Sequence, residues 1–108
     1  MEYKDTDSVI KSKQELNTEY GKKYSKPTRL TETVYDMVSD NYKDRFKAEY
    51  YQLLIRRRKL ATTISDAKEG LLGFNLSCSI DLLTAQLSAM DTYMLILKER
   101  ARIEDIEL

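Results

Sequence analysis

A run of four basic side chains, Arg56 to Lys59, offers the clearest binding chemistry in this 108-residue sequence. Guanidinium and ammonium groups bind phosphates and other anions, so these residues are candidates for holding a charged ligand. Consecutive residues of a helix point in directions about 100° apart, however, so four in a row do not form one patch. We therefore interpret most of the run as solvated charge whose aliphatic stems cover nearby apolar surface.

Arg57 is the exception, because it interrupts an otherwise apolar helical stripe and needs a partner there. One interpretation is a structural ion pair with Asp91 that sets the register of two helices. The other is a pocket between helices, in which Arg56 and Arg57 bind an anionic or nucleotide-like ligand and a tyrosine stacks on its ring. The candidate tyrosines are Tyr50, Tyr51 and Tyr93. Both interpretations stay open at this point.

Catalytic and metal chemistry have few candidates in this chain. It contains no histidine and a single cysteine, Cys78, which removes most zinc and copper sites and every Ser-His or Cys-His nucleophile pair. Its glycines lack the spacing of a phosphate-binding loop or a dinucleotide fingerprint. We therefore expect no enzymatic activity, no metal and no cofactor, and we interpret Cys78 as a bystander.

The composition indicates one folded, helix-rich domain, with 42% apolar and 33% charged residues. The 18 basic and 18 acidic residues cancel, which argues against nucleic acid as a partner, because such binders usually carry a basic excess. No segment approaches the about 20 apolar residues of a membrane-spanning helix, so no membrane partner is expected. A single cysteine and the absence of a signal-like N-terminal run suit a cytoplasmic protein.

Glycine and proline positions allow two long helices in the last two-thirds of the chain. None of these residues lies within residues 28–69 or after Gly73, which predicts helices over about 41–69 and 79–104. The flanking residues suit helix ends. The candidate caps are Ser39, Asp40 and Asn41 before the first helix, Gly70 after it, and Ser77 or Ser79 before the second.

Apolar residues follow a heptad spacing along both predicted helices. The stripe of the first helix runs from Phe46 to Ala67 and that of the second from Ile80 to Ala101, and the second spacing is the first read backwards. Mirror-image spacing is what antiparallel pairing requires, and the net charges of +4 over residues 41–69 and −3 over residues 70–108 suit it. The expected neighbours are Leu53 with Met94 and Leu60 with Leu87.

The second helix carries a further apolar stripe beside its seam, made of Leu82, Ala89, Tyr93, Ile96 and Ile103. A two-helix hairpin alone buries too little surface to be stable, so something else must cover this stripe. The candidates are the N-terminal region and another copy of the chain. We expect a helical-bundle homo-oligomer.

The first 40 residues are less regular. Residues 9–20 form a weak helical stripe, and residues 30–38 form a short one after Pro27, which suits a first helical turn. The expected fold is all-α, with these shorter helices added to the hairpin. We divide the chain into an N-terminal helical extension, residues 1–40, and a helical-hairpin domain, residues 41–108, within one structural unit.

Two segments, Tyr42 to Leu60 and Leu76 to Leu108, share a set of residues with a known family: Arg45, Glu49, Tyr50, Leu53, Arg56, Lys59, Leu60, Cys78, Leu83, Gln86, Met90, Tyr93 and Glu107. With these residues the chain resembles a small family of tailed-phage proteins first catalogued in crAss-like bacteriophages of gut bacteria. The resemblance implies a phage accessory protein in the cytoplasm of an infected bacterium that counters host defence. It acts there either by sequestering a nucleotide-derived immune signal without catalysis, or by binding and inhibiting a host defence protein.

Overall fold

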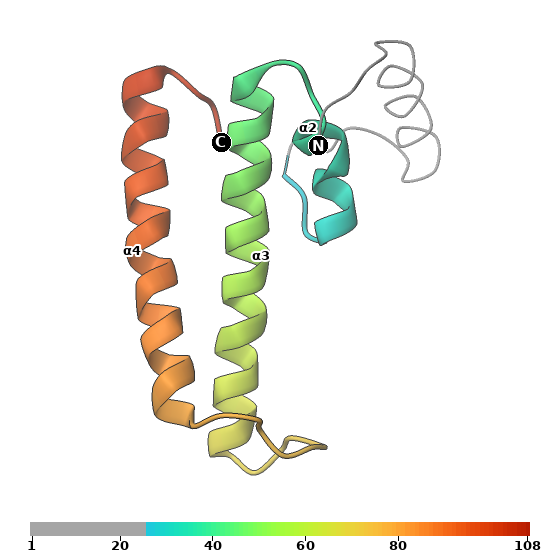
Figure 1. The fold of residues 1–108 in the computed structure, drawn as a ribbon, viewed down its shortest axis with the longest axis vertical. Coiled ribbons are helices and arrows are strands. Elements are labelled where there is room, and N and C mark those ends of the chain that lie inside the picture. Colours follow the sequence, from blue (N-terminus) through green and yellow to red (C-terminus); the bar gives the residue numbers. More distant parts are fainter. Residues whose placement is uncertain (1–25) are drawn as a thin grey trace. The chain divides into compact units, whose positions relative to one another are not determined.

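Residues 26–108, which the computed structural model describes, contain helices and loops and no strand. In chain order the elements are η1 (Leu30–Thr33), α2 (Val34–Met37), α3 (Tyr42–Lys68) and α4 (Ile80–Glu104). Figure 1 shows α3 and α4 as the two long ribbons. The all-α class is confirmed for this range, and both predicted long helices are confirmed to within one residue at each end.

The chain divides into two compact units, and the boundary between them lies inside α3. The first unit ends at Gln52 and includes Leu108, whereas the second is Leu53–Glu107. The division into an extension over residues 1–40 and a hairpin domain after it stays a prediction.

In the first unit, a short helical segment follows Pro27, as the sequence predicts. The turn η1 continues directly into α2, and Thr33 at the junction is 1% exposed. The amide of Gln52 donates a 2.9 Å hydrogen bond to the Thr33 hydroxyl, which satisfies this buried polar group and ties the segment to the first part of α3. The helical stripe predicted over residues 9–20 lies outside the described residues.

Capping residues mark both ends of α3. The side-chain oxygen of Asn41 accepts the Lys43 N–H at 2.9 Å, so Asn41 is the N-cap among the three candidates. Gly70 has a φ of 71°, and the N–H of Leu71 donates to the Asp66 carbonyl at 2.8 Å. This is a Schellman C-cap, and it requires the left-handed backbone conformation that glycine adopts without a steric cost.

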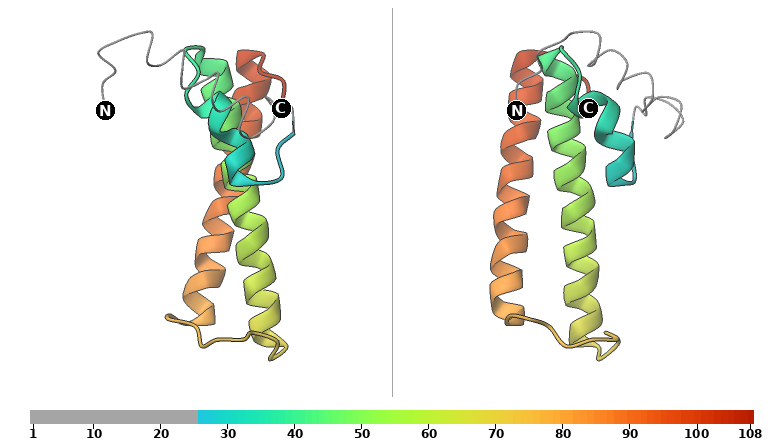
Figure 2. Two further views of the ribbon diagram at one scale, coloured as in Figure 1. Left: turned by 90° about the vertical axis from the view of Figure 1, so that its right-hand side faces the viewer. Right: turned by 45° about the vertical axis from the view of Figure 1, so that its right-hand side comes forward.

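In the second unit, residues 53–68 of α3 and the whole of α4 lie side by side and antiparallel (Figures 1 and 2). The buried and half-buried residues of α4 are the seven predicted seam residues and Glu104, and every other residue of this helix is exposed. The seven are Ile80, Leu83, Leu87, Met90, Met94, Leu97 and Ala101. The predicted seam of α4 is therefore confirmed.

Ser79→Ala is expected to destabilise the start of α4, whereas Ser77→Ala is not. The Ser79 hydroxyl accepts the Leu82 N–H at 3.1 Å, which makes Ser79 the N-cap of the two candidates. Loss of such a cap costs about 1 kcal/mol of folding free energy. Urea denaturation followed by circular dichroism measures the difference. Equal midpoints for the two variants would contradict the assignment.

Candidate functional site

An ion pair between Arg57 and Asp91 joins α3 to α4. Arg57 Nε donates to Asp91 Oδ1 at 2.6 Å, and Arg57 Nη2 lies 3.5 Å from Asp91 Oδ2. The predicted partner is thus confirmed, and with it the register, because a shift of one heptad would move Asp91 away from Arg57. The two side chains are 34% and 49% exposed, so water partly screens the pair.

Acid is expected to remove the contribution of this ion pair to stability. The hydrogen bond from Arg57, together with its charge, lowers the pKa of the Asp91 carboxyl below its usual 3.8. A carboxylate with a lowered pKa stabilises the fold above its unfolded-state pKa and loses that contribution as the pH falls through the folded-state pKa. Asp91→Asn should therefore be less stable than wild type near neutral pH, and the gap should close below a pH of about 3.8.

Chemical denaturation of wild type and Asp91→Asn across a pH series measures this gap. Arg57→Gln serves as the matched variant, because it removes the same pair from the other side. The pH dependence of the two variants should coincide in the acid range. A gap that stays constant with pH would mean that the loss comes from packing, not from the charge of Asp91.

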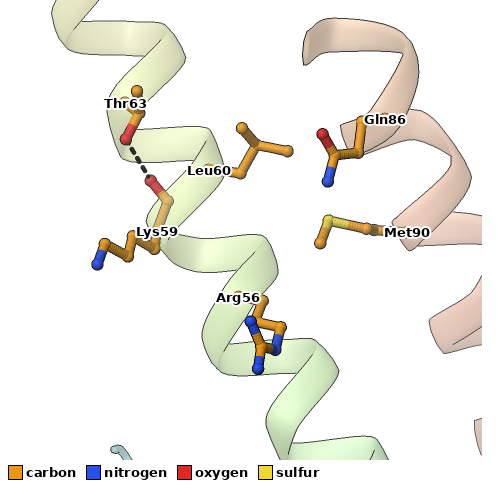
Figure 3. Close-up of a pocket in the computed structure, with 6 residues that line it drawn as sticks. All are labelled: Arg56, Lys59, Leu60, Thr63, Gln86 and Met90. Atoms are coloured by element: carbon orange, nitrogen blue, oxygen red, sulfur yellow. Dashed lines mark hydrogen bonds between the residues drawn. The ribbon is translucent and has the colours of Figure 1, made fainter. Parts of the chain in front are cut away.

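A groove of about 270 Å³ lies between α3 and α4 on one side of the hairpin. We call it the basic groove, and its lining residues are Arg56, Lys59, Leu60, Thr63, Gln86 and Met90. Figure 3 shows Leu60 reaching from α3 towards Gln86 and Met90 of α4, while the Lys59 side chain extends away from α4. The Thr63 hydroxyl donates to the Lys59 backbone carbonyl at 3.0 Å, which leaves the hydroxyl oxygen able to accept a further bond.

The basic groove combines three kinds of recognition chemistry. Leu60 and Met90 are half-buried and form an apolar floor, and a methionine sulfur packs favourably against an aromatic ring. The exposed amide of Gln86 offers donors and an acceptor, which suits the edge of a nucleobase. Arg56 and Lys59 are exposed and supply positive charge for a phosphate or another anion.

The two cations of the basic groove differ from Arg57 in their charge environment. Within residues 26–108, neither Arg56 nor Lys59 forms an ion pair, whereas Arg57 is held by Asp91. A cation that no carboxylate neutralises attracts an anionic ligand more strongly. Arg56 and Lys59 are therefore better placed to bind an anion than Arg57 is.

A second groove, of about 350 Å³, contains the ion pair. We call it the ion-pair groove, and its lining residues are Leu54, Arg57, Asp91, Met94, Leu95 and Lys98. It lies on a different side of the helix pair from the basic groove, because Arg56 and Arg57 point about 100° apart on α3. The fold thus separates two arginines that are neighbours in the sequence.

None of the three candidate tyrosines lines either groove. Tyr50 and Tyr51 belong to the first unit and are 8% and 6% exposed, with ring centroids 5.1 Å apart and rings edge to face. Burial raises the pKa of the Tyr51 hydroxyl. Tyr93 is 41% exposed and follows Met90 by three residues, on the side of α4 that carries Gln86. Tyr93 is therefore the candidate that lies beside the basic groove.

Five lining residues of the basic groove are absent from the site predicted from the sequence: Lys59, Leu60, Thr63, Gln86 and Met90. Helical spacing carried a signal for them. Arg56, Lys59 and Thr63 follow one another at intervals of three and four residues, which places them along one line of α3. Met90 was placed in the apolar seam by its own spacing, and Gln86 lies four residues before it.

A protein-family model for Sequestin matches residues 40–103, which is more than half of the chain. The chain belongs to the Sequestin family. The Sequestin match includes all of α3, all of α4 except Glu104, and both grooves. Neither the curated proteins nor the solved structures contain a match to this chain.

The described residues offer neither a membrane-spanning helix nor a metal-binding cluster. No helix among residues 26–108 is both long and apolar enough to cross a membrane. Over the same range, no three His, Cys, Asp or Glu side chains gather closely enough to hold a metal ion. Both grooves between α3 and α4 bring charged and apolar side chains together.

Proposed function

We propose that this chain binds and sequesters a nucleotide-type signal in the basic groove and releases it unchanged. The observation that carries the proposal is the pairing of two cations that lack an acidic partner, Arg56 and Lys59, with an apolar floor and the Gln86 amide. The two cations suit a phosphate, the apolar floor suits a base ring, and the Gln86 amide suits the edge of a base. The name of the family indicates a sequestering role, which supports the proposal.

The overlap between the groove and the resemblance to phage proteins also supports this site. Five of its six lining residues are among those that carry the resemblance: Arg56, Lys59, Leu60, Gln86 and Met90. We therefore propose a phage accessory protein that counters host defence in the cytoplasm of an infected bacterium. In this role it removes an immune signal from solution by binding it, as a homo-oligomer.

Sequestration without catalysis is supported by the side chains of the basic groove. Its six lining residues include no carboxylate, thiol or imidazole, the groups that most often transfer protons or attack a substrate near neutral pH. A guanidinium stays protonated throughout the physiological range and therefore holds an anion without exchanging protons. We propose no cofactor and no metal for this site.

Isothermal titration calorimetry on the full chain tests the proposal, with a panel of cyclic mononucleotides, cyclic dinucleotides and ADP-ribose derivatives. We expect at least one of them to bind with saturation, and to be recovered intact after heat denaturation of the protein. A panel in which nothing binds at low salt, where electrostatic attraction is strongest, would reject the proposal. Recovery of a cleaved ligand would reject sequestration in favour of catalysis.

The second candidate function is a helical interaction module that binds and inhibits a host defence protein. The observation that favours it is the exposure of large apolar residues in the loop between α3 and α4, where Leu71 is 67% and Phe74 is 65% exposed. Exposed apolar patches often mark protein interfaces. Affinity purification from infected cells tests this function. A stoichiometric host partner that is lost with Leu71→Ser and Phe74→Ser would support it over signal binding.

A further inference from the structure

The outer face of α4 carries an apolar stripe that the described chain leaves open to solvent. Leu82, Ile96 and Ile103 are 61%, 54% and 67% exposed, and Ala89 is exposed as well. These four residues recur every seven positions, so they lie along one line of the helix. Four apolar side chains in a continuous line are a larger patch than isolated surface residues form.

The stripe adjoins the basic groove. Gln86 follows Leu82 by four residues and precedes Ala89 by three, so this groove residue points towards the same side of α4 as the stripe. Tyr93, four residues after Ala89, continues that side. A partner that packs on the stripe therefore lies beside the open side of the basic groove.

We propose that a second copy of this chain packs its own α4 antiparallel on this stripe and closes the open side of the basic groove. The closing of the ligand site rests on the proposed function, whereas the dimer does not. The spacing of the stripe is the same when read in either direction, which an isologous two-fold contact requires. Antiparallel pairing sets Leu82 against the partner's Ile103, and the small Ala89 against the partner's large Ile96.

Charge along α4 favours the antiparallel arrangement over the parallel one. Residues 80–92 contain two acidic residues and no basic one, whereas residues 93–104 contain three basic and two acidic residues. Asp91 is already paired with Arg57 of α3, so antiparallel pairing brings a half with one uncompensated acid, Asp81, against a half of net charge +1, and a parallel pair would set like charges together. The two helix dipoles also oppose each other favourably in this arrangement.

The size of the basic groove gives a second reason for a covering chain. Its volume of about 270 Å³ is slightly below the usual range of small-molecule sites, about 300–1,000 Å³, and its lining residues Arg56, Lys59 and Gln86 are exposed. Ligand sites commonly enclose most of the ligand surface. A partner helix beside Gln86 supplies the missing wall, so the dimer should hold a nucleotide-type ligand more tightly than a single chain does.

Light scattering after size-exclusion chromatography tests the interface with two neighbouring substitutions on the full chain. Wild type should have twice the 12.6 kDa of one chain, and Ile96→Glu, which places a charge in the stripe, should be monomeric. Leu95→Glu is the matched control, because Leu95 is 66% exposed but points away from the stripe, and it should stay dimeric. Circular dichroism verifies that both variants keep their helix content.

Disulfide trapping tests the direction of pairing in a Cys78→Ser background. Residues 82 and 103 of one helix are about 31 Å apart, so they cannot join within one chain. An antiparallel dimer should cross-link between chains with Leu82→Cys and Ile103→Cys together, and not with Leu82→Cys alone. Cross-linking by Leu82→Cys alone, a monomeric wild type, or a dimeric Ile96→Glu would each overturn the proposal.

Binding measurements separate this inference from the proposed function. With the tightest ligand of the calorimetric panel, monomeric Ile96→Glu should bind at least tenfold more weakly than wild type, and Leu95→Glu should bind like wild type. A monomeric Ile96→Glu that binds like wild type would overturn the closing of the groove and leave the ligand site standing. A trapped antiparallel dimer that binds nothing would reject the proposed function and leave the interface standing.

Discussion

Leu97→Ala is expected to lower the free energy of unfolding by about 2–5 kcal/mol, the largest stability loss for a single substitution proposed for this chain. Leu97 is 1% exposed, in the most buried part of α4. Truncation removes apolar contact area and leaves a cavity that the surrounding helices fill only in part. Urea denaturation followed by circular dichroism measures the loss, at one fixed protein concentration because self-association would shift the apparent stability.

Leu95→Ala is the control for this substitution. It deletes the same atoms from the same helix, two residues away, but Leu95 is 66% exposed and has far less contact to lose. Its free energy of unfolding should stay within about 0.5 kcal/mol of wild type. Equal losses in the two variants would show that helix propensity, and not burial, sets the stability at these positions.

Arg56→Ala is expected to weaken binding of the proposed nucleotide-type ligand about tenfold, which corresponds to the loss of one charge-assisted hydrogen bond. Lys59→Ala should weaken it by a similar factor, because both residues line the basic groove without an acidic partner. The double variant should lose about a hundredfold if the two contacts act independently. Calorimetry with the tightest ligand of the panel measures all three affinities.

Arg58→Ala is the matched control for Arg56→Ala. It removes an arginine from the same helix, so net charge and helix propensity change equally, but Arg58 is exposed and lines neither groove. Its affinity should stay close to wild type. Equal losses in both variants would mean that the ligand responds to the overall charge of α3, and not to the basic groove.

Arg56 and Arg57 are neighbours in the chain but differ in their charge environment, which is why we propose Arg56 and not Arg57 as a binding residue. Arg57 points towards α4 and meets Asp91 at 2.6 Å, so its charge is already compensated. Arg56 points to another side, where the lining residues supply no carboxylate. A ligand anion can compensate Arg56 without breaking an existing pair, whereas binding to Arg57 would have to compete with Asp91.

Most of the secondary structure could be predicted from the sequence, because short-range physical preferences set it. The bounds of α3 and α4 follow from the cap at Asn41, the left-handed Gly70, and the absence of glycine and proline between the helix ends. The choice of Ser79 over Ser77 did not follow, since both residues cap equally well in principle. Only the hydrogen bond to Leu82 distinguishes them.

The candidate site was less predictable than the fold. Helical spacing indicated the seam and the Arg57–Asp91 pair, because residues three, four and seven apart share a face whatever the fold. The burial of Tyr50 followed from its place in the apolar stripe of the first helix, whereas that of Tyr51 was not indicated, because an aromatic ring suits a binding surface and a core equally well. Lys59 was considered as part of the basic run but interpreted as solvated charge, and Gln86 was missed because a polar side chain beside an apolar seam looks like ordinary solvated surface.

The sequence by itself determined the two long antiparallel helices of the all-α region over residues 26–108, their apolar seam, and Asp91 as the candidate partner of Arg57. These features depend on periodicity and capping, which are properties of nearby residues. Only the tertiary structure decided that the side chains beside Arg56 come from α4, that Arg57 is already paired, and that the outer stripe of α4 stays uncovered. These features depend on how one helix is rotated about its axis against the other. Heptad spacing predicts which face of each helix meets its partner, but not which neighbouring side chains on that face come into contact.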